Sequence, residues 1–78
     1  MKYAIVIEKA ERNYSAYVPD LPGCIATAKS VEETRRVMRE AIEFHIEGLR
    51  LHGDVAPAAT SICEYIEIGA PEPATRRG

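Results

Sequence analysis

The chain has 78 residues, which is enough for one domain and too few for two. Hydrophobic residues make up 46% and charged residues 28%, the composition of an ordinary folded domain, so disorder is excluded for most of the chain. Ten Lys and Arg against 12 Asp and Glu give a net charge of -2, whereas proteins held to nucleic acid by phosphate contacts are usually basic. The sequence therefore predicts a small acidic domain and argues against a dedicated nucleic-acid binder.

The apolar runs of the sequence are short. None approaches the roughly 18 residues of a membrane span, and the apolar start of the chain is broken by Glu8, which does not fit a secretory signal. We therefore predict a cytoplasmic location without membrane contact. Cys24 and Cys63 could form one disulfide bridge, but nothing indicates an oxidising compartment, so they are interpreted as two reduced, semi-buried thiols.

The first half of the chain shows the period of two that is typical of strands. Residues 2–8 and 14–18 alternate in this way and are separated by a short polar stretch, which predicts an antiparallel hairpin. Residues 19–23 contain two prolines and a glycine and cannot continue a central strand, so they predict a stiff, shaped loop. Residues 24–28 are predicted to form a short third strand.

A helix is predicted over residues 31–51. Ser30 and Glu33 have the spacing of a capping box, in which each side chain accepts from the amide of the other residue, and Gly53 marks the end. Apolar and small residues recur at helical spacing, so one side of the helix is predicted to pack against the sheet. That side consists of Val31, Thr34, Val37, Met38, Ala41, Ile42, His45, Gly48 and Leu49.

Residues 61–68 alternate again and predict a fourth strand, which a helical crossover allows to lie parallel to a neighbour. The predicted fold is therefore α+β in the order β-β-β-α-β, with an antiparallel three-stranded sheet, one amphipathic helix and a last strand. Residues 1–68 form the domain, and residues 69–78 are predicted to be a flexible tail.

One helix covers only one face of such a sheet, so the other face needs solvent-tolerant side chains or a partner. Phe44 and Leu51 lie at one margin of the apolar side of the helix and Ile46 at the other. We predict an oligomer interface that contains Phe44, Leu51 and Tyr65, with the edge of the core as the alternative interpretation of the helix residues.

The sequence lacks the usual patterns of catalytic and metal sites. It has no glycine-rich phosphate loop, and His45 and His52 are seven apart, whereas helical metal pairs are usually four apart. Glu8, Asp20 and Glu64 are the carboxylates near predicted strands, and a divalent-metal site would need them to converge. We therefore predict no catalytic residues, no metal and no cofactor, and keep a degenerate metal-dependent nuclease as a minor alternative.

The proline-rich loop is the most distinctive surface that the sequence predicts. We assign partner binding to Tyr17, Pro19, Asp20, Leu21 and Pro22, which form the loop and the residue near its start. An alternative role for Asp20 is structural, because an aspartate at this place in a turn often accepts hydrogen bonds from nearby loop amides.

The string Tyr14-Ser15-Ala16-Tyr17-Val18-Pro19-Asp20-Leu21-Pro22-Gly23-Cys24, followed by a capped helix with Arg39-Glu40-Ala41-Ile42 and Ile46-Glu47-Gly48-Leu49, resembles the HicB antitoxin family over roughly residues 2–68. The resemblance implies a β-β-β-α-β core of partial ribonuclease-H-like fold without enzymatic activity. It also implies a partner, a small basic toxin of the HicA type, which cleaves RNA and is masked by the antitoxin, and a tendency to form homo-oligomers.

The chain departs from the family pattern in three places. Ala28-Lys29-Ser30 lacks the glycine that often precedes the helix, and Ala59 replaces the second proline of the loop that contains Pro57. Nothing after Ile68 has the length of a DNA-binding module, so direct DNA binding is not expected. The alternative to an antitoxin is an orphan homo-oligomeric module with a structural or ligand-binding role.

Overall fold

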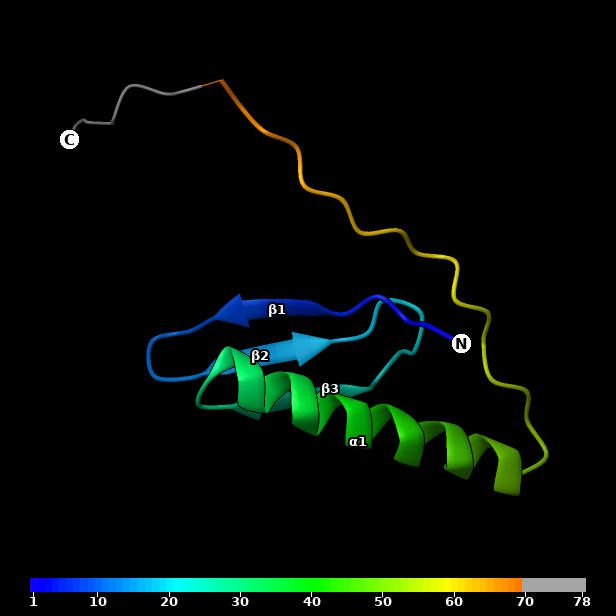
Figure 1. The fold of residues 1–78 in the computed structure, drawn as a ribbon. Helices are drawn as coiled ribbons and strands as arrows, with labels where there is room; N and C mark the ends of the chain where they lie inside the picture. The colour runs from blue at the N-terminus through cyan, green and yellow to red at the C-terminus, as the bar shows by residue number, and fades with distance from the viewer. Residues whose placement is uncertain (70–78) are drawn as a thin grey trace.

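The structure is a computed structural model, and it describes residues 1–69. Three strands precede one helix: β1 (Val6–Lys9), β2 (Tyr14–Tyr17), β3 (Ile25–Ala28) and α1 (Val31–Leu51) (Figure 1). The strands form an antiparallel sheet in the order β1-β2-β3. The predicted α+β class and the antiparallel three-stranded sheet are therefore confirmed.

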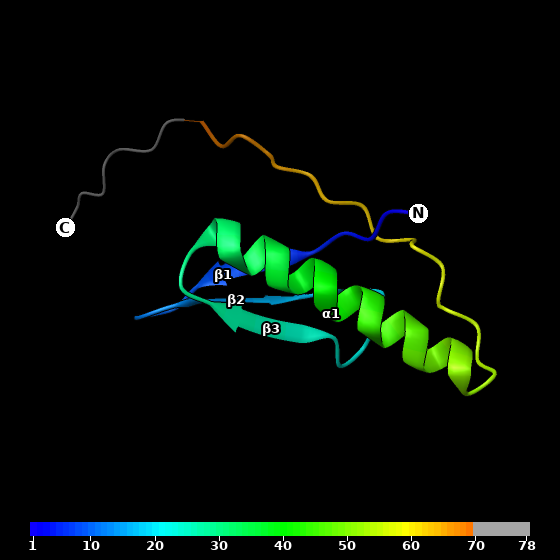
Figure 2. The ribbon, with the colours of Figure 1, turned by 60° about the horizontal axis from the view of Figure 1, so that its bottom comes forward.

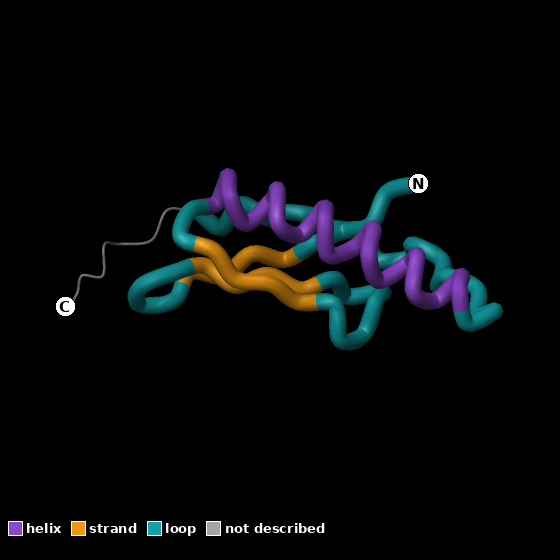
Figure 3. Tube along the Cα trace, turned by 90° about the horizontal axis from the view of Figure 1, so that it is seen from below, coloured by secondary structure: helices purple, strands orange, loops and turns teal. Residues whose placement is uncertain are grey.

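The fold has two layers, with α1 lying across one face of the sheet (Figures 2 and 3). Side chains alternate between the two faces of a strand, and the register brings Ile7, Ala16 and Ala26 into one row across the sheet. Ala16 is buried in the core that the sheet, loop and helix share, and Ile7 and Ala26 pack against that core. The other members of the buried core are Val18, Leu21, Cys24 and Met38.

The bounds of the helix agree with the prediction. Ser30 is the N-cap, and its hydroxyl accepts a hydrogen bond of 3.0 Å from the Glu33 amide. The Glu33 carboxylate lies 3.6 Å from the Arg36 guanidinium, so the reciprocal half of the predicted capping box is replaced by an ion pair on the helix surface. At the other end, Gly53 has a φ of +78°, a left-handed conformation that glycine adopts at little cost and that ends the helix.

The Ser30 cap leads to a stability prediction. The Ser30→Ala variant is expected to lose about 1 kcal/mol of unfolding free energy, because the Glu33 amide then lacks its side-chain acceptor. Chemical denaturation followed by circular dichroism measures the difference. The Ser30→Asp variant is the matched control, since aspartate is an equally good cap, and an alanine variant as stable as the parent chain would contradict the assignment.

The predicted fourth strand is not formed. Residues 61–68 have no ladder partner, and the chain beyond α1 runs as an extended segment that diverges from β1 (Figure 1). A strand is stable only when its backbone groups are paired, and the contacts of Thr60 and Ser61 hold the start of this segment at the end of the sheet. The structure therefore does not show a partial ribonuclease-H-like core. Of the predicted tail, residues 70–78 lie outside the described residues.

Candidate functional site

The loop between β2 and β3 consists of two consecutive turns. The Leu21 amide donates to the Val18 carbonyl at 3.1 Å, and the Cys24 amide donates to the Leu21 carbonyl at 3.1 Å. The Val18 amide closes the loop by donating to the Cys24 carbonyl at 3.2 Å. Each turn thus spans four residues, and the second begins at the residue where the first one ends.

The sequence accounts for both turns. Pro19 and Pro22 each occupy the second position of a turn, where the fixed φ of proline is already favourable. Gly23 occupies the third position of the second turn with a φ of +84°, which is the geometry of a type II turn. Both prolines fix the backbone angle φ at their own positions, in the unfolded chain as well as in the folded one. The loop is therefore stiff and presents its exposed side chains in one arrangement.

The five residues predicted to bind a partner lie in different environments. Pro19 and Pro22 are exposed on the loop, Tyr17 is 42% exposed at the end of β2, and Asp20 is half-buried. Leu21 is completely buried between the two turns and belongs to the core cluster with Met38. Its side chain supports the shape of the loop and does not reach the surface.

An apolar row crosses the sheet face that α1 leaves uncovered. Val6 pairs with Tyr17 and Tyr17 with Ile25, so the three side chains lie in register next to the loop. Ile25 is 69% exposed, which is unusual for a large apolar strand residue. We call Val6, Tyr17 and Ile25 the open-face row. Sequence analysis did not identify Val6 or Ile25 as site residues. The signal for Ile25 is its place next to the buried Cys24, because neighbouring residues of a strand point to opposite faces.

Asp20 connects the loop to the segment after the helix. Its Oδ2 accepts from the amides of Thr60 at 3.0 Å and Ser61 at 2.9 Å, and its Oδ1 accepts from the hydroxyls of the same residues at 3.2 and 2.9 Å. These hydrogen bonds, that of the Ser61 amide first, lower the pKa of the Asp20 carboxyl, and partial desolvation opposes the shift. Asp20 therefore accepts from amides, as the structural alternative predicted, but from a segment 40 residues away rather than from its own loop.

The lowered pKa predicts a pH dependence. The charged Asp20 is favoured in the folded chain, so these contacts contribute fully above the ordinary pKa of 3.8 and are lost as the pH falls through the lowered value. In an NMR titration, the amide signals of Thr60 and Ser61 are expected to shift with a midpoint below 3.8. The Asp20→Asn variant removes this titration, and a midpoint at or above 3.8 in the parent chain would contradict the geometry.

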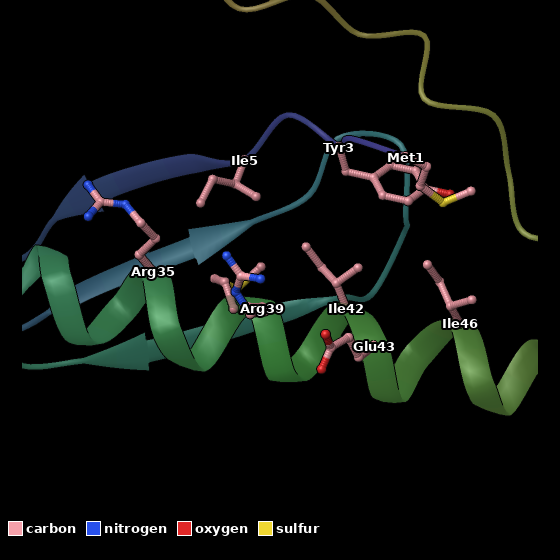
Figure 4. A pocket seen from close by; sticks show the side chains of 9 residues that line it. Met1, Tyr3, Ile5, Arg35, Arg39, Ile42, Glu43 and Ile46 are labelled. Atoms are coloured by element: carbon pink, nitrogen blue, oxygen red, sulfur yellow. The ribbon is translucent and has the colours of Figure 1, made fainter.

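A groove of about 390 Å³ lies between α1 and the chain that leads into β1. Apolar side chains from both elements line it, and Arg35, Arg39 and Glu43 lie along its helix side (Figure 4). The apolar lining residues are Met1, Tyr3, Ile5, Met38, Ile42 and Ile46. Ile46, predicted at a margin of the helix stripe, is thus part of a surface depression that the sequence analysis did not foresee.

The residues predicted for an oligomer interface lie on two separate parts of the chain. Phe44 and Leu51 are exposed on α1, two helical turns apart, and neither lines the groove. Tyr65 lies in the extended segment and is fully exposed, although it borders a second hollow beside β1 together with Ile5 and Ile7.

The carboxylates considered for nuclease chemistry do not converge with other ligands. Among residues 1–69, no three His, Cys, Asp or Glu side chains lie close enough to hold a metal ion. Glu8 and Glu64 are exposed, and both Asp20 oxygens are occupied by Thr60 and Ser61.

No helix among residues 1–69 is long and apolar enough to cross a membrane.

Both cysteines are free thiols, as predicted, but neither is semi-buried. Cys24 is buried in the core, and this burial raises the pKa of its thiol, whereas Cys63 is exposed in the extended segment. The Cys63 thiol lies 3.9 Å from the Ile5 carbonyl oxygen, a weak contact between the segment and the chain entering β1.

The fold and the loop define a small α+β domain with a rigid surface loop, and comparison with known proteins places it in a family. The model described as "HicB_like antitoxin of bacterial toxin-antitoxin system" matches residues 3–73. The chain therefore belongs to the HicB-like antitoxin family, as its sequence motifs predicted.

Similar proteins include one from a phage and two from archaea. The chain is 39% identical over 66 residues to an "Uncharacterized 14.9 kDa protein in rep-hol intergenic region" of Haemophilus phage HP1, a match that covers 85% of this chain and 50% of the phage protein. It is 52% identical over 48 residues to a "UPF0150 protein" of Archaeoglobus fulgidus, covering 60% of this chain and 70% of the relative. A UPF0150 protein of Thermoplasma acidophilum is 40% identical over 58 residues, or 73% of this chain and 84% of the relative.

The chain thus spans about half the length of the phage relative. No solved structure matches the chain significantly.

Proposed function

We propose that this chain is an antitoxin that binds a small basic toxin of the HicA type in the cytoplasm and sterically masks its RNA-cleaving site. The observation that carries the proposal is the open-face row, which exposes apolar side chains beside a rigid loop in a member of an antitoxin family. The chain itself performs no chemistry in this proposal. It prevents RNA from reaching the toxin.

The proposed contact surface combines the open-face row with the exposed prolines of the loop. Pro19 and Pro22 adjoin Tyr17 and Ile25, and Asp20 and Leu21 hold the loop in place from behind. Preorganised apolar side chains bind at a low entropic cost, because little freedom remains to be lost. A specific interface needs at least ~1,000 Å² in total, to which the sheet face and the loop both contribute.

Charge supports the same kind of partner. The chain has a net charge of -2, and Glu8 follows Val6 on the uncovered face at the two-residue spacing that keeps side chains on one side of a strand. A toxin that binds RNA carries a basic surface. Opposite charges accelerate association and favour an orientation in which the acidic partner covers the RNA-binding surface.

The test begins with the proteins encoded next to this chain. A small basic neighbour is expected to co-purify with the chain when both are expressed together, and the neighbour alone is expected to cleave RNA. Adding the purified chain at an equimolar concentration is expected to stop that cleavage. A neighbour that cleaves RNA equally well with and without the chain, and does not bind it, would contradict the proposed antitoxin role.

We also propose that the chain self-associates. Among residues 1–69, the buried core contains only five hydrophobic residues, while eleven large hydrophobic residues are exposed, including Phe44, Leu51 and Tyr65. A chain this short gains stability when a partner buries such surface. The groove beside β1 favours a second candidate function, an orphan homo-oligomeric module, which would self-associate without binding any toxin. Sedimentation equilibrium combined with the toxin assay separates the two.

A further inference from the structure

We propose that residues 61–68 of one copy of this chain dock as a strand along the β1 edge of a second copy and place isoleucine side chains into the groove beside α1. The exchange is reciprocal, so each copy provides one segment and one groove. The proposal specifies how the chain self-associates and rests on that part of the proposed function. It is independent of the toxin.

The receiving surface is an open sheet edge with an apolar groove next to it. Within residues 1–69, β1 has one hydrogen-bonded neighbour, β2, and no described strand pairs with the backbone groups on its other side, where a further strand can add. Tyr3 and Ile5 in the chain that leads into β1 and Ile42 and Ile46 on α1 face the same groove (Figure 4). An added strand would pair with β1 through its backbone and cover the groove with alternate side chains.

The extended segment has the side chains that this surface requires. Ile62, Ile66 and Ile68 are all highly exposed, and the alternation of an extended chain puts them in one row. The row is interrupted by Glu64, and the segment contains no Lys or Arg. Arg35 and Arg39 line the groove and have no ion pair among the described residues, and they outnumber the one acidic lining residue, Glu43, so an acidic strand is electrostatically complementary to the groove.

The structure indicates that the acceptor is another copy rather than the segment's own chain. The four hydrogen bonds of Asp20 hold Thr60 and Ser61, and the segment after them makes no backbone hydrogen bond with its own β1. The contact of the Cys63 thiol with the Ile5 carbonyl oxygen, at 3.9 Å, is the sole hydrogen bond that residues 62–68 make with other described residues.

The direction of the side chains supports the same conclusion. Tyr65 borders the hollow beside the chain's own β1, and alternation therefore turns the isoleucine row to the other side. The radius of gyration is 16.2 Å, whereas a compact domain of this length has about 12 Å, because the segment does not pack on its own body. In a reciprocal exchange each copy provides both a segment and a groove, so the dimer is closed by its two-fold symmetry and needs no third partner.

Single substitutions test the two sides of the contact. The parent chain is expected to sediment as a dimer of twice the 8.6 kDa chain mass. Ile66→Asp in the segment and Ile46→Asp in the groove are each expected to weaken dimerisation at least ~100-fold, because the two-fold symmetry counts each change twice. Phe44→Asp tests the alternative interface at Phe44 and Leu51, since Phe44 is exposed on the same helix and lies outside the groove, and strand exchange leaves its dimer intact.

Mixing the variants distinguishes exchange from packing within one chain. Ile66→Asp retains an intact groove and Ile46→Asp an intact segment, so an equimolar mixture is expected to form heterodimers although each variant alone is monomeric. The double variant contains neither and is expected to pair with neither single variant. Circular dichroism checks that the variants are folded. If Ile46→Asp does not fold, Arg39→Glu replaces it, because Arg39 is exposed and lines the same groove.

An isotope-filtered NMR experiment gives a second readout. In a dimer of one labelled and one unlabelled chain, intermolecular NOEs are expected between the Ile66 and Ile42 side chains. A monomeric parent chain, a dimer that Phe44→Asp disrupts while Ile66→Asp does not, or NOEs from residues 61–68 to the same chain's β1 alone would each overturn the proposal. Loss of toxin inhibition without loss of the dimer would contradict the antitoxin role and leave the exchange unaffected.

Discussion

The Leu21→Ala variant is expected to lose about 3–4 kcal/mol of unfolding free energy. Leu21 is completely buried between the two turns of the loop, and its removal leaves a cavity in a core of only five buried hydrophobic residues. A chain of 78 residues has a total stability of about 4–12 kcal/mol. The variant therefore loses a large part of its stability.

Urea denaturation followed by circular dichroism measures this effect. Leu51→Ala is the matched control, because it removes the same atoms from a residue that is 71% exposed, and it is expected to change stability by less than about 0.5 kcal/mol. The Leu21→Met variant, which approximately conserves side-chain volume, is expected to recover most of the loss. Equal effects of the two alanine variants would show that the loop does not close over the core as described.

The second large effect is expected on toxin binding. Ile25→Asp places a charge at the β3 end of the open-face row, and binding would have to desolvate this carboxylate where the parent chain buries an apolar side chain. The affinity for the toxin is expected to fall at least ~100-fold, as it does when an anchor residue of an interface is lost. The fold is expected to remain intact, because Ile25 is 69% exposed and outside the buried core.

Thr27→Asp is the control for charge. Thr27 is the next residue on β3 that points to the same face, and it is exposed, so this variant adds the same charge two residues away from the row. Isothermal titration with the co-purified toxin, together with the RNA cleavage assay, compares the two variants. If Thr27→Asp weakens binding as much as Ile25→Asp, charge rather than the apolar row governs the interaction. If neither weakens it, the toxin binds elsewhere on the chain.

The helix and the loop illustrate what can be predicted from local sequence. Ser30 before an amphipathic stretch and Gly53 after it were sufficient to place α1 at residues 31–51, because capping and helical periodicity depend on residues within a few positions of each other. The two prolines and Gly23 likewise predicted a stiff loop, since each restricts or permits the backbone angles of its own position. The family was recognisable from the same local string.

The strand predicted at residues 61–68 shows what local sequence patterns cannot predict. Its alternation of apolar and polar residues is the pattern of a strand, but a pattern does not contain the partner that supplies the hydrogen bonds. Asp20 is a second example. The sequence suggested that it accepts from amides, and the donors at Thr60 and Ser61 are about half the chain away.

Sequence alone was therefore sufficient for the class of fold, the bounds of the helix, the stiffness of the loop and the family. Those features follow from backbone preferences and periodicities that act over a few neighbouring residues. The open-face row, the groove beside β1 and the clamp of Asp20 on residues 60–61 follow from strand register and helix packing. They join residues far apart in the chain, and long-range geometry of this kind is encoded by the sum of all contacts rather than by any local pattern.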